Sequence, residues 1–143
     1  MERRAYGRGG PGCYTGAMDE SKPVVLLIED DPFMIGILSE QLSAAGFKVV
    51  FADDGEKAVK AFPESHPSVL IVDVLLPKKS GLQALRDIRA LPGGKTVPAV
   101  VLSNIEEESY MREAHELGVK SYLIKANMQL PEIVEKVKEA MRG

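Results

Sequence analysis

The sequence predicts an α/β fold in which helices cover both faces of a five-stranded parallel sheet. Its 143 residues correspond to one compact domain, since domains usually contain roughly 100 to 200 residues. Apolar residues make up 45% of the chain and charged residues 27%, close to the averages of roughly 45–50% and about 25% for soluble domains. From Pro23 onward, apolar segments of strand length alternate with segments of helical period. Each parallel crossover needs a helix to return the chain, so this alternation indicates parallel strands.

The start of the chain differs from the rest. Residues 1–22 are rich in glycine and have no aliphatic pattern, so they bury too little apolar surface to offset the entropy of ordering. We therefore predict a flexible glycine-rich leader over residues 1–22 and a folded domain over residues 23–143.

Local signals predict the first two strands and the helix between them. Residues 24–28 are all apolar and predict a buried strand. Asp31 and Pro32 predict the start of the next helix, because Asp caps a helix and Pro fits its first position. Gly46 ends this helix, and residues 47–52 predict the second strand. One face of the helix carries Met34, Leu38, Gln41, Leu42 and Ala45.

The middle of the chain predicts two short helices and two strands. A helix follows Gly55, and residues 69–72 predict a third strand that ends at Asp73. Another helix comes next, and residues 98–102 predict the fourth strand, where the proline is tolerated at the strand start. The apolar positions of the two helices are Ala58, Val59 and Phe62, and Leu82, Leu85 and Ile88.

The last part of the chain predicts a helix, a strand and a closing helix. The first helix is expected over residues 105–117, because Gly118 stops it, and the fifth strand over residues 120–125. The apolar face of the closing helix comprises Leu130, Ile133, Val134, Val137 and Met141.

The composition of the strands predicts their order. Strands one, three and four are apolar throughout, as strands covered on both faces should be. Lys48 interrupts strand two, and Lys120 and Ser121 interrupt strand five, so these two are expected at the edges. With right-handed crossovers, the pattern predicts a flavodoxin-like, doubly wound (βα)5 three-layer sandwich of strand order 2-1-3-4-5. Its ligand crevice opens at the carboxyl ends of strands one and three.

Charge and apolar run length argue against nucleic-acid and membrane binding. The 18 basic and 21 acidic residues leave a net charge of −3, which gives no attraction for a polyanion. The longest apolar runs fall far short of the roughly 18 residues that span a bilayer. No apolar stretch follows the charged start, as a secretion signal would require, and the single cysteine, Cys13, forms no internal disulfide. We therefore expect a cytoplasmic protein that binds neither nucleic acid nor membrane directly.

The chemically useful side chains all follow the predicted strands. Three carboxylates in one place would repel by about 4 kcal/mol for each pair at 4 Å and an effective dielectric near 20, so a cation is expected between them. Mg²⁺ suits such oxygen ligands, and a lysine is the alternative cation; both are compatible with the sequence. Asp31 is interpreted as a helix cap because Pro32 follows it. The set comprises Glu29 and Asp30 after strand one, Asp73 after strand three, Ser103 after strand four and Lys125 after strand five.

This pattern resembles the receiver domain of two-component response regulators, in particular stand-alone regulators of the chemotaxis type. The resemblance covers about residues 22–142 and assigns residues 23–143 to the receiver domain. The matching features are Glu29-Asp30 after Leu27-Ile28, Asp73 in the segment VDVLLP with Ser80-Gly81 after it, Ser103 after Val100-Val101-Leu102, and Tyr122 three residues before Lys125.

The resemblance implies a phosphorylation site. Asp73 would accept a phosphoryl group from a histidine kinase or a histidine phosphotransfer protein. Mg²⁺ would be held by Asp30, Asp73, the backbone carbonyl of Leu75 and, through water, Glu29. Ser103 and Lys125 would bind the phosphoryl oxygens, and Tyr122 would move with the switch.

The resemblance also implies how the chain would act. Because the chain ends directly after the closing helix, it is expected to act by docking to an unknown downstream protein through its fourth helix, fifth strand and fifth helix. A monomer or a weak phosphorylation-dependent dimer is expected. Beyond its own phosphorylation and dephosphorylation, no enzymatic turnover is expected.

Two positions depart from the family pattern. The family usually has a cis proline after its lysine, whereas Ala126 follows Lys125 here. A cis bond to alanine costs about 2.5–4 kcal/mol, so we expect either a trans loop with a re-aimed Lys125 or a strained loop. Leu75 and Ile105 lie two positions past Asp73 and Ser103, and neither side chain can hydrogen-bond an attacking water. This predicts slow hydrolysis of the phospho-aspartate.

Three other functions fit the sequence less well. A degenerate receiver would bind partners without phosphorylation, an alternative that Ala126 keeps open. A Mg²⁺-dependent phosphohydrolase with an aspartyl-phosphate intermediate would usually carry a second acid two residues beyond its nucleophile, where this chain has Leu75. A nucleotide or flavin site is disfavoured because no glycine-rich loop follows strand one. His66 and His115 are expected at the surface, away from the site.

Overall fold

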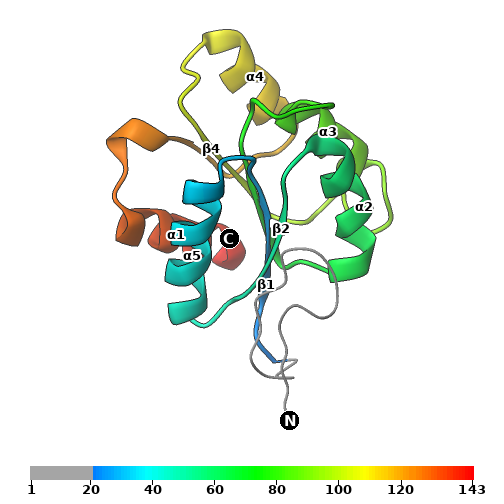
Figure 1. The fold of residues 1–143 in the computed structure, drawn as a ribbon. Coiled ribbons are helices and arrows are strands. Elements are labelled where there is room, and N and C mark those ends of the chain that lie inside the picture. Colours follow the sequence, from blue (N-terminus) through cyan, green and yellow to red (C-terminus); the bar gives the residue numbers. More distant parts are fainter. Residues whose placement is uncertain (1–20) are drawn as a thin grey trace.

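The computed structural model describes residues 21–143 and confirms the predicted architecture (Figure 1). Five parallel strands form one sheet in the order β2-β1-β3-β4-β5. In chain order the elements are β1 (Val24–Ile28), α1 (Pro32–Ala44), β2 (Lys48–Ala52), α2 (Gly55–Ser65), β3 (Val69–Val72), α3 (Gly81–Arg89), β4 (Ala99–Ser103), α4 (Glu108–Glu116), β5 (Ser121–Ile124), the 3-10 helix η1 (Lys125–Asn127) and α5 (Leu130–Arg142). The predicted leader lies almost wholly in residues 1–20, outside the described residues.

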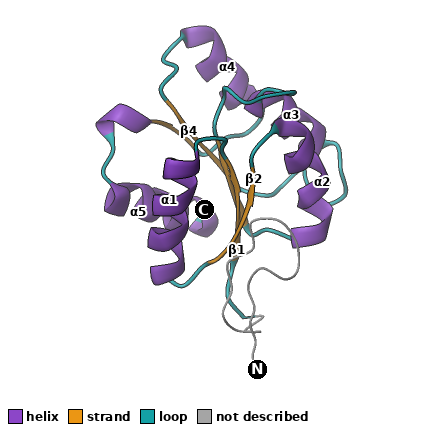
Figure 2. Cartoon of the chain, in the orientation of Figure 1, coloured by secondary structure: helices purple, strands orange, loops and turns teal. Residues whose placement is uncertain are grey.

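Different helices cover the two faces of the sheet (Figure 2). Leu27 of β1 packs in one core with Leu38 of α1 and Val137 of α5. Leu26 packs in the other core with Phe62 of α2 and with residues of α3. Neighbouring residues of a strand point to opposite faces, so one apolar strand contributes to both cores. The two cores explain why β1 and β3 are apolar along their whole length.

The register of the central strands places their carboxyl ends side by side. Ile28, the last residue of β1, pairs with Val72, the last residue of β3. It also pairs with Ala52 of the edge strand β2. Residues that directly follow β1 and β3 therefore start at the same level of the sheet.

The caps of α1 follow the predicted signals. Asp31 accepts a hydrogen bond from the backbone N–H of Phe33 at 3.0 Å, and Pro32 occupies the first helical position. Beyond the other end of the helix, Gly46 has a φ of 100°, a conformation that favours glycine. The start of this helix is thereby fixed directly after the acidic residues that follow β1.

The fourth helix is shorter than predicted. The sequence predicts it over residues 105–117, whereas α4 begins at Glu108. Instead of hydrogen bonds within a helical turn, the backbone of Ile105 forms hydrogen bonds with the side chains of Ser103 and Tyr122. Its apolar side chain suggested the helical period, but these contacts keep residues 104–107 in a loop.

Arg89 connects three segments at the opposite end of the sheet. Its Nε donates to the carbonyl of Leu117, the C-terminal cap of α4, at 2.9 Å. Its Nη1 donates to the carbonyls of Gly94, at 2.9 Å, and Val97, at 2.5 Å. Partial burial of the guanidinium lowers its pKa from the ordinary value. These hydrogen bonds fasten the C-terminal end of α4 to the end of α3.

Candidate functional site

The three predicted acids meet at the carboxyl ends of β1 and β3. Glu29 and Asp30 directly follow β1, and Asp73 directly follows β3. Carboxylate oxygens of the three residues all lie within 4.8 Å of one another. Glu29 and Asp73 are buried, whereas Asp30 is exposed. The sheet register thus brings residues 44 positions apart in sequence into one acidic cluster, which is Glu29, Asp30 and Asp73.

Lys125 supplies a positive charge to this cluster. Its Nζ lies 2.9 Å from Asp73 Oδ2 and 2.9 Å from Glu29 Oε1. Burial raises the pKa of the Glu29 carboxyl, and the Lys125 hydrogen bond offsets part of that rise. Desolvation by itself would lower the pKa of Lys125, but its hydrogen bonds to Glu29 and Asp73 outweigh desolvation and raise it. The lysine therefore stays protonated between two buried acids.

The connection from Lys125 to Ala126 differs from one sequence-based expectation. No peptide bond among residues 21–143 is cis, so of the two expected alternatives the loop is the trans one. The lysine is nevertheless not turned away from the site, because its Nζ reaches both buried carboxylates. The backbone continues into η1 at this point, and the long, flexible lysine side chain spans the distance to the acids.

Ser103 and Tyr122 are connected through the backbone of Ile105. The buried Ser103 Oγ accepts a hydrogen bond from the Ile105 N–H at 3.2 Å. The Tyr122 hydroxyl donates to the Ile105 carbonyl at 2.7 Å. Burial and the nearby negative charge of Asp73 raise the pKa of Tyr122, so its hydroxyl keeps its proton. A displacement of the β4–α4 loop would therefore act on both side chains.

Sequence reasoning did not anticipate one contact of this loop. Asn104 Oδ1 accepts a hydrogen bond from the Ala126 N–H at 3.0 Å. This contact joins the loop after β4 to the turn after β5. The position of Asn104 directly after Ser103 is the only sequence signal that pointed to it.

Two glycines, Gly81 and Gly55, lie very close to the backbone of Asp73 and of the loop that follows it. A Cβ at Gly81 would lie 1.7 Å from the Asp73 carbonyl oxygen, and one at Gly55 would lie 2.0 Å from the Lys79 carbonyl oxygen. The Gly81 N–H donates to the Val74 carbonyl at 2.8 Å. Such contacts leave no room for a side chain, so the backbone around Asp73 and Lys79 is closely packed. The side chain of Leu75, between these two residues in sequence, is 58% exposed.

The acidic cluster has the donor chemistry that Mg²⁺ prefers. Mg²⁺ is a hard cation that binds carboxylate and carbonyl oxygens and usually keeps several waters. The cluster offers carboxylate oxygens from Glu29, Asp30 and Asp73, and the exposed Asp30 leaves one side open to water. The residues present therefore fit a divalent cation.

The other candidate residues lie apart from the cluster. His66 is exposed and forms the C-cap of α2, and His115 is exposed on α4, as predicted. Cys13 lies outside the described residues.

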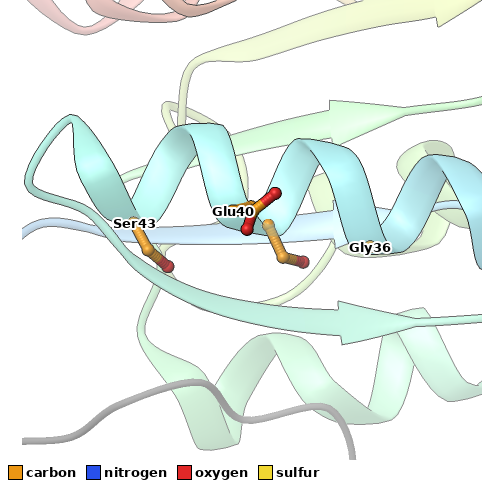
Figure 3. Close-up of a pocket in the computed structure, with 4 residues that line it drawn as sticks. Gly36, Glu40 and Ser43 are labelled. Carbon is orange, nitrogen blue, oxygen red and sulfur yellow. The ribbon is translucent and has the colours of Figure 1, made fainter.

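A cavity of about 350 Å³ lies along α1 (Figure 3). Its lining includes Gly36, Ser39, Glu40 and Ser43, all from this helix. The Ser39 Oγ is buried without a hydrogen-bond partner in the described part of the chain. None of the residues predicted for phosphoryl chemistry is among the described residues that line the cavity, so it is separate from the acidic cluster.

Comparison with known proteins agrees with this geometry. The sequence profile of the response regulator receiver domain matches residues 25–138. The transcriptional regulatory protein KdpE of Mycobacterium tuberculosis (strain CDC 1551 / Oshkosh) is 32% identical over 119 residues, which cover 83% of this chain and 51% of KdpE. The chain spans about half or less of the length of the curated relatives it matches.

Solved structures share the fold. The response regulator domain of Thermotoga maritima CheB has a TM-score of 0.75 at 28% identity, covering 85% of this chain and 98% of that one. The receiver domain of the sensor histidine kinase PA1611 of Pseudomonas aeruginosa PAO1 has a TM-score of 0.77 at 24% identity, covering 85% and 99%. That structure holds a magnesium ion in its active-site cleft.

A parallel sheet of order 2-1-3-4-5 with polar residues at its switch point defines a class of doubly wound α/β domains. Within that class, the profile match over most of the sequence places the chain: it belongs to the response regulator receiver domain family of two-component systems. Across residues 21–143, no helix is both long and apolar enough to cross a membrane.

Proposed function

We propose that this chain receives a phosphoryl group on Asp73 from a histidine kinase or a histidine phosphotransfer protein and passes the signal on by docking. The observation that carries the proposal is the placement of Asp73 beside Glu29 and Asp30, with Lys125 Nζ 2.9 Å from its Oδ2. A cytoplasmic location, as expected from the sequence, is part of the proposal.

Asp73 is the nucleophile in this proposal. A carboxylate that is ionised at pH 7 needs no general base, and catalysis of phosphoryl transfer consists mostly of positioning and charge stabilisation. An Asp73 oxygen forms the new O–P bond while the N–P bond of the phosphohistidine breaks, and the imidazole leaves with the electron pair of that bond. The closely packed backbone at Gly81 supports a fixed direction for the attacking carboxylate.

Glu29, Asp30, Asp73 and the Leu75 carbonyl would hold Mg²⁺. When bound, Mg²⁺ neutralises charge between the nucleophile and the incoming phosphoryl group. Lys125 would bind one phosphoryl oxygen with its compact ammonium, which already lies against Asp73. The Ser103 hydroxyl would donate to another oxygen, since its present hydrogen bond to Ile105 uses it only as an acceptor.

The output would follow from the movement of Ser103. If Ser103 is drawn toward the phosphoryl group, its hydrogen bond to the Ile105 N–H is strained, and the Tyr122 bond to the same residue changes with it. We propose that this shifts α4, β5 and α5 between two packings and alters the surface they present to a downstream protein. The side chain of Met111 on α4, which is 40% exposed, belongs to this surface.

Phosphorylation is tested by intact-mass spectrometry after incubation with acetyl phosphate, with and without Mg²⁺. We expect the wild-type protein to gain one phosphoryl mass in a Mg²⁺-dependent manner and Asp73→Asn to gain none. Asp53→Asn is the matched control, because Asp53 is paired with a surface lysine at the start of α2. A folded wild-type protein that binds Mg²⁺ but gains no mass, from acetyl phosphate or from histidine kinases, would refute the proposal and favour a phosphorylation-independent binding module.

A further inference from the structure

The three residues that follow Leu102 take part in hydrogen bonds within the loop after β4, with β5 and with the turn after β5. Ser103 accepts from the Ile105 N–H, and the Ile105 carbonyl accepts from Tyr122. Asn104, between them, is connected to the turn after β5 through the Ala126 N–H, at 3.0 Å from Asn104 Oδ1. The loop that carries one proposed phosphoryl ligand is therefore hydrogen-bonded to the turn that carries the other.

We propose that Asn104 is a positioning residue for Lys125. The Ala126 N–H lies at the start of η1, where the first N–H groups of a helical turn have no acceptor within the turn. The Asn104 oxygen satisfies it from outside the turn and thereby fixes the backbone position from which the Lys125 side chain starts. The inference rests on the proposed function, since Lys125 matters because it meets Asp73 and the phosphoryl group.

The hydrogen bond between Asn104 and Ala126 contributes little to the free energy of unfolding. Asn104 and Ala126 are both exposed, so water replaces the hydrogen bond when Asn104 is truncated. Lys125, by contrast, has a flexible side chain whose amine must stay between Glu29 and Asp73. The expected consequence of losing the bond is therefore a local loosening of Lys125 in a protein that remains folded.

A lysine-labelling experiment tests the inference without phosphorylation. The Mg²⁺-free protein is treated briefly with acetic anhydride, and peptide mass spectrometry measures acetylation at each lysine. We expect Asn104→Ala to increase labelling of Lys125 about threefold or more, the order expected for one lost hydrogen bond. Labelling of the exposed Lys60 and Lys95 should stay unchanged.

Two further variants separate positioning from a general structural effect. Glu106→Ala alters an exposed residue of the same loop and should leave Lys125 labelling at the wild-type level. Asn104→Asp retains an acceptor oxygen and should keep Lys125 protected. Equal labelling of Lys125 in the wild type and Asn104→Ala, or a parallel rise at all lysines, would overturn the inference.

The acetyl phosphate reaction gives the functional arm of the same experiment. At saturating Mg²⁺, Asn104→Ala should accept the phosphoryl group about three- to tenfold more slowly than the wild type, while its Mg²⁺ affinity changes less than twofold. A wild-type protein that is not phosphorylated would refute the proposed function, whereas the labelling result would still decide whether Asn104 holds Lys125.

Discussion

Removal of Lys125 should destabilise the metal-free protein strongly. The change Lys125→Met retains a flexible stem of similar length but deletes the ammonium that lies 2.9 Å from both Glu29 and Asp73. At an effective dielectric near 20, charges 4.8 Å apart repel by about 3.5 kcal/mol, and each contact at 2.9 Å contributes about 6 kcal/mol of attraction. Desolvation offsets much of this attraction, and loss of one partner of a buried pair costs about 3–5 kcal/mol.

The expected loss is about 3 kcal/mol at pH 7 without Mg²⁺, the lower end of that range, because protonation of Glu29 relieves part of the repulsion. Urea unfolding followed by far-ultraviolet circular dichroism measures it. Mg²⁺ should restore more stability to Lys125→Met than it adds to the wild type, because the cation replaces a missing positive charge.

A surface lysine provides the control for this experiment. Lys57 pairs with Asp53 at 3.0 Å, but both side chains are about half exposed. Lys57→Met should therefore leave the unfolding midpoint unchanged. Equal midpoints for the wild type, Lys57→Met and Lys125→Met, or a Lys125→Met protein that Mg²⁺ stabilises no more than the wild type, would refute the electrostatic reasoning.

Three further predictions concern the same site. Because the folded-state pKa of Glu29 is raised above its ordinary value of 4.5, the folded protein takes up a proton first as the pH falls. Wild-type stability should therefore rise relative to Glu29→Gln between pH 7 and 4.5 in metal-free urea titrations; a flat difference would contradict the assigned burial. Gly81→Ala should cost about 1–3 kcal/mol in the same assay and slow phosphorylation of Asp73, because its Cβ collides with the Asp73 carbonyl. Phospho-Asp73 should persist for minutes and Leu75→Asn should shorten its lifetime, measured by mass spectrometry after removal of acetyl phosphate; a wild-type lifetime of seconds would argue against the role given to Leu75.

Most of the fold could be predicted because its signals are local or periodic. The buried strands β1 and β3 appear in the sequence as uninterrupted apolar runs, and Asp31 with Pro32 marks the start of α1. The strand order followed from Lys48 and the polar residues near the start of β5, because only edge strands tolerate such interruptions.

The site was predictable to the extent that it depends on strand ends. Glu29, Asp30 and Asp73 could be placed together because parallel strands end at the same edge of the sheet. The start of α4 could not be predicted in this way, because Ile105 fits a helical period. Ile105 lies in a loop instead, where its backbone forms hydrogen bonds with Ser103 and Tyr122. Such contacts depend on the packed fold and leave no periodic signal in the sequence.

The two ends of α4 are held differently, so a rotation of the helix would move one end more than the other. Arg89 holds the carbonyl of Leu117 at one end, whereas Glu107 at the other end makes no capping hydrogen bond with its side chain. The helix has nine residues and is thus roughly 13 Å long at about 1.5 Å per residue. Pivoting by about 10° around the Arg89 end would carry the free end through roughly 2 Å. The N-terminal end of α4, near Ile105, would therefore move the most, and this is the end that a displacement of Ser103 would reach. The end held by Arg89 would move the least.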